Sequence, residues 1–183
     1  MTRIVAISGS RREGSTTRTA LRVALDAAGD AGAETDLIDL GAVDLPLYHP
    51  DEDAQGDSEA LTRRVREADG VLAGTPVYRG SYSSTFKNFH DFCGSDEYAN
   101  TAVGLLATAG GGSYGGTLEH LRSTFRNVHA WTVPDEVGIE RASSKVATGG
   151  DPHDHPRITD DDLRRRTERL GRVVLEHAER MRG

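Results

Sequence analysis

The first residues able to do chemistry form a short segment rich in hydroxyl and guanidinium groups. Residues 8–17 read Ser-Gly-Ser-Arg-Arg-Glu-Gly-Ser-Thr-Thr, between a β-branched run and a helical pattern. A turn from a buried strand into a helix gathers unpaired backbone N–H groups at the positive end of the helix dipole. The hydroxyls and an arginine, Arg11 or Arg12, add further donors. We therefore expect an anion site, and so many donors suit a terminal phosphate.

This segment differs from the two common nucleotide-binding loops. The dinucleotide fingerprint G-x-G-x-x-G has glycines where this segment has hydroxyls, and the G-x-x-x-x-G-K-[ST] pattern of nucleoside-triphosphate sites is missing. The alternative without a ligand is a helix capped by Ser15, Thr16 or Thr17, with arginines that face solvent. The position and composition together favour the phosphate site.

Two later loops follow apolar runs in the same way. In 75–84, Pro76 ends a strand and residues 77–80 can offer backbone polar groups to the edge of a flat heterocycle, beside Tyr78 and Tyr82. The third loop, 109–116, contains G-x-G-x-x-G, but in the fourth unit and without a suitably spaced acid in a following βαβ unit. Its glycines would let backbone approach a planar ligand without a Cβ clash, although a flexible turn is the alternative.

The elements that must position these loops alternate along the chain. Apolar runs predict strands at 3–8, 34–40, 70–75 and 101–109 and a fifth, interrupted by Pro134, within 129–140. Helical spacing predicts helices at 15–30, 58–69, 83–92, about 117–127 and 159–182. This alternation is typical of one parallel sheet covered on both faces, whose ligand lies at the carboxyl ends of the strands. The three loops follow the carboxyl ends of the first, third and fourth predicted strands.

Composition limits the class of protein. A chain of 183 residues predicts one domain, 1–183, and the net charge of −7 argues against nucleic acid as a partner. One cysteine, Cys93, excludes an intramolecular disulfide and a Cys-rich metal site, and we expect it to be buried. No apolar run approaches the ~18 residues needed for a membrane span, and no signal peptide is recognisable. We expect a cytoplasmic protein without a membrane partner.

The remaining polar candidates favour structural roles. His90 falls on an apolar helix face, which favours a core or interface position, and Lys87 and Asp91 are spaced to pair on one helix. His153 and His155 in an Asp/Pro/His loop, 151–156, could hold a metal, but a solvated loop is the favoured interpretation. No side chain is therefore assigned a catalytic role.

The three loops resemble the NADPH-dependent FMN reductase family over roughly residues 3–140. The family's G-S-x-R-x-x-S motif is present at 9–15, and its T-P-x-Y-x-x-S motif is present at 75–81. Phe86-Lys87-Asn88 corresponds to its L-K-N, and residues 45–48 match its L-P-L-Y. Three motifs in the right order on the right elements make the resemblance fairly specific.

The resemblance implies a flavodoxin-like fold, a doubly wound five-stranded parallel sheet of order 2-1-3-4-5, with FMN and NADPH as cofactors. It places the phosphate on Ser10, Arg12, Ser15 and Thr17, the pyrimidine edge on the backbone of 76–79, and 110–113 beside the ring. The loops and the resemblance together give these cofactor-binding candidates: Ser10, Arg12, Ser15, Thr16, Thr17, Pro76, Val77, Tyr78, Arg79, Ser81, Gly110, Gly111, Gly112 and Ser113.

Three positions depart from the family pattern. Thr17 stands where the family often has Asn, and Val77 and Arg79 stand where an acid and an Asn are common. Arg79 would add positive charge at the ring edge, which should stabilise anionic reduced flavin and could meet a phosphate of the nicotinamide nucleotide.

The resemblance implies an oxidoreductase that passes hydride from NADPH to N5 of FMN and then to a small-molecule acceptor: free flavin, a quinone, or an azo or nitro compound. Enzymes of this kind are usually homodimers or homotetramers, and the 41–57 loop and the Phe86/Phe89 helix are candidate contacts. One alternative is a flavodoxin-like FMN electron carrier without a NAD(P)H site. Another is a binding protein for a different phosphorylated ligand.

Overall fold

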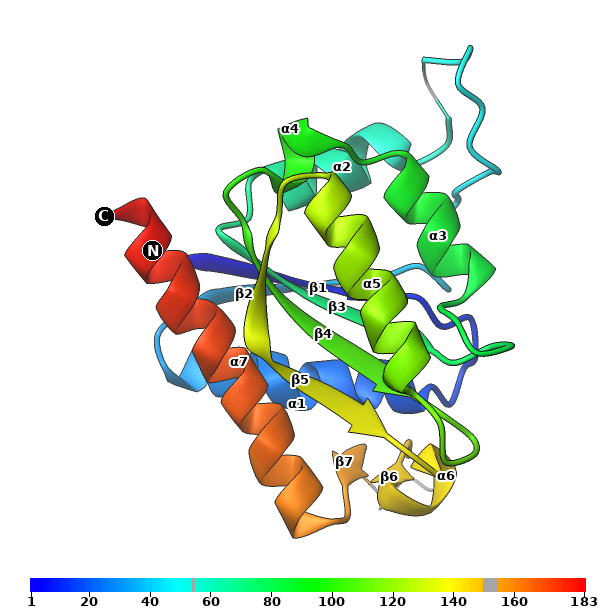
Figure 1. The fold of residues 1–183 in the computed structure, drawn as a ribbon, viewed down its shortest axis with the longest axis vertical. Coiled ribbons are helices and arrows are strands. Elements are labelled where there is room, and N and C mark those ends of the chain that lie inside the picture. The colour runs from blue at the N-terminus through cyan, green and yellow to red at the C-terminus, as the bar shows by residue number, and fades with distance from the viewer. Residues whose placement is uncertain (54, 150–154) are drawn as a thin grey trace.

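Five parallel strands form the centre of the molecule (Figure 1). The computed structural model describes residues 1–53, 55–149 and 155–183. The sheet has the order β2-β1-β3-β4-β5, so the predicted flavodoxin-like order 2-1-3-4-5 is confirmed. The strands are β1 (Arg3–Ser8), β2 (Glu34–Asp39), β3 (Gly70–Pro76), β4 (Ala102–Thr108) and β5 (Trp131–Ile139).

Helices cover both faces of this sheet, as expected. On one face lie α1 (Thr16–Asp30) and α7 (Asp161–Arg182), and on the other lie α2 (Ser58–Arg66), α3 (Ser84–Asp91) and α5 (Gly115–Asn127) (Figure 1). The period of two along each strand explains this: Ile4 and Ala6 join the first core, and Val5 and Ile7 join the second. Strands buried on both faces therefore appear as continuous apolar runs.

Short polar side chains fix where the helices begin. The Ser15 hydroxyl accepts a hydrogen bond from the N–H of Arg18 at 3.1 Å, and the Ser83 hydroxyl accepts one from the N–H of Phe86. The first cap selects Ser15 among the three candidates that the sequence offered. The helix α2 has Asp57 at its N-cap position without a side-chain cap hydrogen bond, and its first residue, Ser58, is buried.

The segment after β5 contains more structure than its sequence indicates. It forms α6 (Ala142–Lys145), β6 (Val146–Ala147) and β7 (Arg157–Ile158), and a further short helix, α4 (Ser95–Tyr98), precedes β4. Such short elements carry no measurable periodicity. The sequence predicts that Pro134 interrupts the fifth strand, but β5 continues through it. Proline is tolerated here because β5 is an edge strand and its pairing with β4 shifts register between Val103 and Leu105. His153 lies outside the described residues.

The aromatic residues of α3 belong to the core and limit how this helix could contact a second subunit. Phe86 and Phe89 are buried in the chain's own core, so α3 can meet a second subunit only through its polar face. His90 is a core residue, as expected, and its burial lowers its pKa. Cys93 is buried, as expected, and this burial raises the pKa of its thiol to about 12.

The long connection between β2 and α2 is tied down at two places. The side chain of Asn88 accepts a hydrogen bond from the N–H of Tyr48 at 2.9 Å and donates one to the carbonyl of Pro46 at 2.8 Å. Buried Gln55 bonds the backbone of His49 in both directions. Asn88 thus joins the two sequence motifs at 45–48 and 86–88, while Leu47 remains 84% exposed.

The described residues include neither a candidate membrane span nor a candidate metal cluster. No helix there has the length and apolar character to span a membrane. The same residues contain no cluster of three or more His, Cys, Asp or Glu side chains arranged to hold a metal.

The contact between α1 and α7 depends on Gly171. A Cβ at this position would lie 1.9 Å from the carbonyl oxygen of Ala24, which is backbone and cannot move aside. We expect Gly171→Ala to lower the free energy of unfolding by about 3 kcal/mol, measured by urea denaturation. The matched control is Gly29→Ala in α1, where the new Cβ would meet only ordinary contacts at 3.6 Å or more. The control should be neutral or slightly stabilising, and an equal loss in both variants would contradict the packing argument.

Candidate functional site

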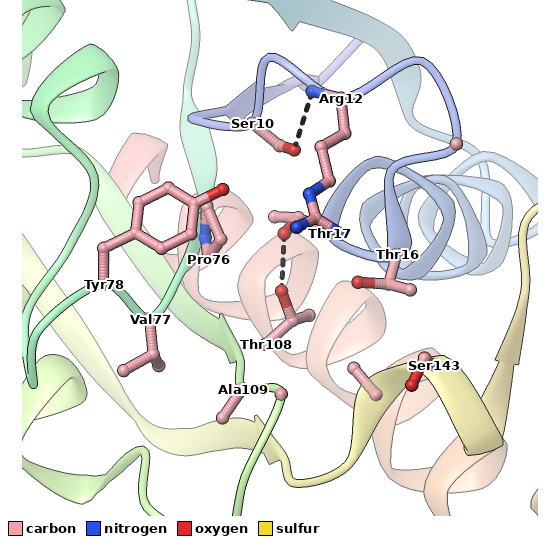
Figure 2. Close-up of a pocket in the computed structure, with 13 residues that line it drawn as sticks. Ser10, Arg12, Thr16, Thr17, Pro76, Val77, Tyr78, Thr108, Ala109 and Ser143 are labelled. Atoms are coloured by element: carbon pink, nitrogen blue, oxygen red, sulfur yellow. Dashed lines mark hydrogen bonds between the residues drawn. The ribbon is translucent and has the colours of Figure 1, made fainter.

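A pocket of about 260 Å³ lies at the carboxyl edge of the sheet, between the loops that follow β1, β3 and β4 (Figure 2). This is the edge that the strand pattern predicts for a ligand. The residues that line it come from four segments of the chain: Ser10, Arg12, Gly14, Thr16, Thr17, Pro76, Val77, Tyr78, Thr108, Ala109, Gly110, Ala142 and Ser143.

The first two loops are bonded to each other directly. The Ser83 hydroxyl donates a hydrogen bond to the carbonyl of Gly9 at 2.6 Å while it caps α3, and the N–H of Gly9 donates to the carbonyl of Gly74 at 2.8 Å. A Cβ at Gly9 would lie 2.7 Å from Cβ of Phe86. Gly9 is therefore required by close packing of the loop against α3, which explains the glycine that begins the G-S-x-R motif.

The two arginines of the first loop and Arg18, near the start of α1, have different surroundings. Arg12 lines the pocket, its side chain points into it toward Thr17, and within the described residues its guanidinium has no carboxylate partner (Figure 2). Arg11 lines a separate hollow beside Leu45 and Asn88. Arg18 pairs with Asp39 at the end of β2 at 2.7 Å and also donates to the carbonyl of Glu13, so its charge is already neutralised by the chain's own carboxylate. Of the two candidates, Arg12 is the cation available to a ligand.

Two buried hydroxyls meet on the wall of the pocket. Thr17, in the first turn of α1, and Thr108, at the end of β4, are hydrogen-bonded through their Oγ1 atoms at 2.6 Å (Figure 2). One of the two hydroxyl hydrogens is used inside this pair, so the pair has one hydrogen left to donate elsewhere. This bond also fixes the start of α1 against the end of the neighbouring strand.

The second loop ends in a tight turn. The N–H and C=O of Tyr78 bond those of Ser81 at 2.9 and 3.1 Å, and both central residues have positive φ, 54° at Arg79 and 80° at Gly80. The N–H of Val77 donates to the carbonyl of Thr108 at 2.8 Å, which fixes the base of the turn to β4. Among the described residues, the backbone N–H and guanidinium of Arg79 have no partner, so both are free for a ligand.

A histidine on α5 supports this turn from outside. Nδ1 of His120 lies 2.9 Å from the Ser81 hydroxyl, and its ring contacts Tyr82 edge-on. Tyr78, by contrast, is about half exposed at the pocket. The two tyrosines of this loop therefore have separate positions: Tyr78 beside the pocket, and Tyr82 against Phe86 and His120.

Three of the five glycines of the third loop have no role in the packing of the described residues. A Cβ on Gly110, Gly111 or Gly115 would meet no described atom within 4 Å, and none of the three has positive φ. The loop is held through its backbone, because the N–H of Arg141 donates to the carbonyl of Gly111 at 2.9 Å. Open space beside these glycines leaves room for a flat ligand.

The pocket brings together eight of the fourteen residues that the sequence indicated: Ser10, Arg12, Thr16, Thr17, Pro76, Val77, Tyr78 and Gly110. Ser15 is buried as the cap of α1, while Ser81 bonds His120. Arg79, Gly111, Gly112 and Ser113 are exposed and do not line the pocket. Sequence reasoning missed five lining residues: Gly14, Thr108, Ala109, Ala142 and Ser143. Thr108 could have been found as the polar residue that ends a buried strand, but nothing local marks Ser143.

Comparison with known proteins agrees with this fold and these motifs. The model of the NADPH-dependent FMN reductase family matches residues 2–144. A NADPH azoreductase of Bacillus sp. (strain OY1-2) is 34% identical over 142 residues, 75% of this chain and 76% of its own. A NADH-dependent FMN reductase of Pseudomonas putida, SfnE, is 32% identical over 148 residues, 79% of this chain and 78% of its own.

The solved structures give the same fold. The flavoenzyme NAD(P)H:(acceptor) oxidoreductase FerB from Paracoccus denitrificans superposes with a TM-score of 0.76 at 22% identity, covering 98% of each chain. The fold is flavodoxin-like, and the family model and the curated relatives identify the chain as an oxidoreductase. The chain belongs to the NADPH-dependent FMN reductase family, and FMN and NADPH are its cofactors.

The residues of the pocket fit FMN chemically. Hydroxyls and Arg12, which has no carboxylate partner in the described part of the chain, lie at the N-terminus of α1, and this suits a phosphate dianion. At the other end, a partly exposed tyrosine and open backbone beside Gly110 suit an aromatic ring system. The family's cofactor therefore has a matching donor set in this chain.

Proposed function

We propose that this protein is an NAD(P)H-dependent flavin reductase that transfers hydride from NADPH to N5 of bound FMN and passes the electrons to a small-molecule acceptor. Free flavin, quinones and azo or nitro compounds are the acceptor classes. Residues 1–183 act in this proposal as a single FMN-binding domain. The observation that carries it is the pocket in which the loops after β1, β3 and β4 meet at the carboxyl edge of the sheet.

The phosphate end of the site is assigned to the first loop. Ser10, Thr16 and Thr17 bring hydroxyls to the pocket, and Arg12 brings a cation without a competing carboxylate among the described residues. Ser15 contributes by capping α1, which holds the N-terminal N–H groups of that helix in place. Charge-assisted hydrogen bonds of this kind are roughly twice as strong as neutral ones.

The ring end is assigned to the second and third loops. The backbone of 76–79 is held by the bond from Val77 to Thr108 and by the Tyr78–Ser81 turn, so its free polar groups are already oriented before a ligand arrives. Gly110 to Ser113 offer open backbone on the adjoining side. Preorganised groups lose little entropy on binding, which favours affinity.

FMN, when bound, supplies the redox chemistry, and the protein supplies binding, orientation and charge. Among the described residues that line the pocket, no pair is typical of a general acid and base, so we assign no catalytic side chain. The role of Arg12 and the hydroxyls is to hold the phosphate, and the role of the second loop is to hold the ring and leave one side open to substrate.

The first experiment tests FMN binding and reduction together. The purified protein should bind FMN, and NADPH added without oxygen should bleach the visible flavin absorbance. Bound FMN that NADPH fails to bleach would instead indicate an electron carrier, and failure to bind FMN would indicate a different phosphorylated ligand.

Arg12→Ala should weaken FMN binding about 30-fold, or ~2 kcal/mol, in a fluorescence titration. The matched control, Arg11→Ala, changes a residue outside the pocket and should stay within twofold of wild type.

The second experiment addresses Arg79. Its guanidinium has no partner in the described part of the chain and lies on the turn beside the pocket, so it is free to meet reduced flavin or a nucleotide phosphate. We expect Arg79→Ala to raise the KM for NADPH about tenfold or to lower the midpoint potential of bound FMN, measured by steady-state kinetics and redox titration. Arg126→Ala on the exposed surface of α5 is the matched control. Unchanged KM and potential in Arg79→Ala would remove this role.

The oligomeric state is a homodimer or homotetramer in this proposal. Exposed Leu47 and the partly exposed Tyr48, on a connection tied to α3, give an apolar surface suited to a second subunit. Leu47→Asp should lower the mass measured by light scattering, because a carboxylate at a subunit contact is costly to desolvate. Asp44→Ala in the same connection should leave the mass unchanged. A monomeric wild-type protein would contradict the assignment.

A further inference from the structure

The segment after β5 brings a hydroxyl to the phosphate end of the pocket. Arg141 takes a left-handed conformation, with φ of 48°, and turns the chain so that the N–H of Ala142 donates to the carbonyl of Ala109 at 2.9 Å. Ala142 is buried against the pocket wall, and the next residue, Ser143, lines the pocket together with Thr16. Figure 2 shows Thr16 between Arg12 and Ser143 in that view.

The same segment is anchored at its far end. Val146 pairs with Ile158 in the β6–β7 ladder, and both side chains are buried in the core that contains α1. Thr148 packs directly on the first loop, since a Cβ at Gly14 would lie 3.1 Å from its Oγ1. The position of Ser143 relative to the first loop is therefore fixed from both sides.

The two neighbouring serines of α6 differ in how their hydroxyls are used. The Ser144 hydroxyl donates to the carbonyl of Arg141 at 2.8 Å and does not line the pocket. The Ser143 hydroxyl has no hydrogen-bond partner among the described residues. The nearby acid Glu140 lies 3.4 Å from the amine of Lys145 and 3.6 Å from the guanidinium of Arg141, so its charge is compensated and does not oppose an anion.

We propose that Ser143 is a further phosphate-binding residue, whose hydroxyl donates a hydrogen bond to the terminal phosphate of FMN. This inference rests on the proposed FMN site and adds a fourth segment of the chain to it. A donor to a doubly charged group is stronger than one to a neutral group. Ser143 thus favours FMN over riboflavin, which has the same ring and ribityl chain but no phosphate.

The test compares two ligands and two serines. The apoproteins of wild type, Ser143→Ala and Ser144→Ala are titrated with FMN and with riboflavin, and quenching of flavin fluorescence gives each dissociation constant. We expect Ser143→Ala to weaken FMN binding about tenfold and to leave riboflavin binding within twofold. Ser144→Ala should match wild type for both ligands. Melting temperatures of the apoproteins should agree, because Ser143 is exposed.

Two outcomes would overturn the assignment. Unchanged FMN affinity in Ser143→Ala would show that the hydroxyl makes no useful contact, and an equal loss for FMN and riboflavin would place its contact on the part that the two ligands share. Failure of the FMN site itself has a different signature. In that case wild type would show no preference for FMN over riboflavin, and Arg12→Ala would have no effect either.

Discussion

The site depends on one hydrogen bond, from the buried Ser83 hydroxyl to the carbonyl of Gly9 at 2.6 Å. The same hydroxyl caps α3, so the start of that helix, the loop after β1 and the loop after β3 are fixed by one oxygen atom. The separation between the phosphate end and the ring end of the pocket follows from this bond and from the close contact of Gly9 with Phe86. A buried hydroxyl that gives and accepts hydrogen bonds is costly to replace, since its removal leaves a buried carbonyl and N–H unsatisfied.

The sheet, its order and most of the site could be predicted from the sequence because their signals are local. Strands buried on both faces appear as unbroken β-branched runs, and the loops that matter follow those runs directly. Ser10, Arg12 and Thr17 belong to one ten-residue stretch, so their meeting at the N-terminus of α1 requires only that the strand and helix form. The loop residues alone could not show which of Arg11 and Arg12 faces the pocket, because the two arginines differ only in the side of the loop on which they lie.

What the sequence could not show depends on contacts between distant segments. Thr17 carries no sign that its hydroxyl bonds Thr108, 91 residues away, which lowers its capacity to donate to a ligand. Asn88 fixes the Leu-Pro-Leu-Tyr segment from 40 residues away. The motifs at 45–48 and 86–88 look like separate binding signals in the sequence, but part of their role is this one structural contact. Ser143 lies in a four-residue helix after an arginine with positive φ, and neither feature has a periodicity that a pattern can detect.

The turn at the ring end shows how the fold and the site are coupled. An arginine with φ of 54° is in a conformation that costs non-glycine residues of the order of 1 kcal/mol. The two Tyr78–Ser81 hydrogen bonds and the contact between Ser81 and His120 stabilise the turn against that cost. A glycine at this position would form the same turn with less strain, as Gly80 beside it does. Arg79 thus places a guanidinium where the backbone conformation favours glycine. Within the described residues this guanidinium makes no ion pair and no hydrogen bond. This supports a role for Arg79 toward a ligand rather than in the fold.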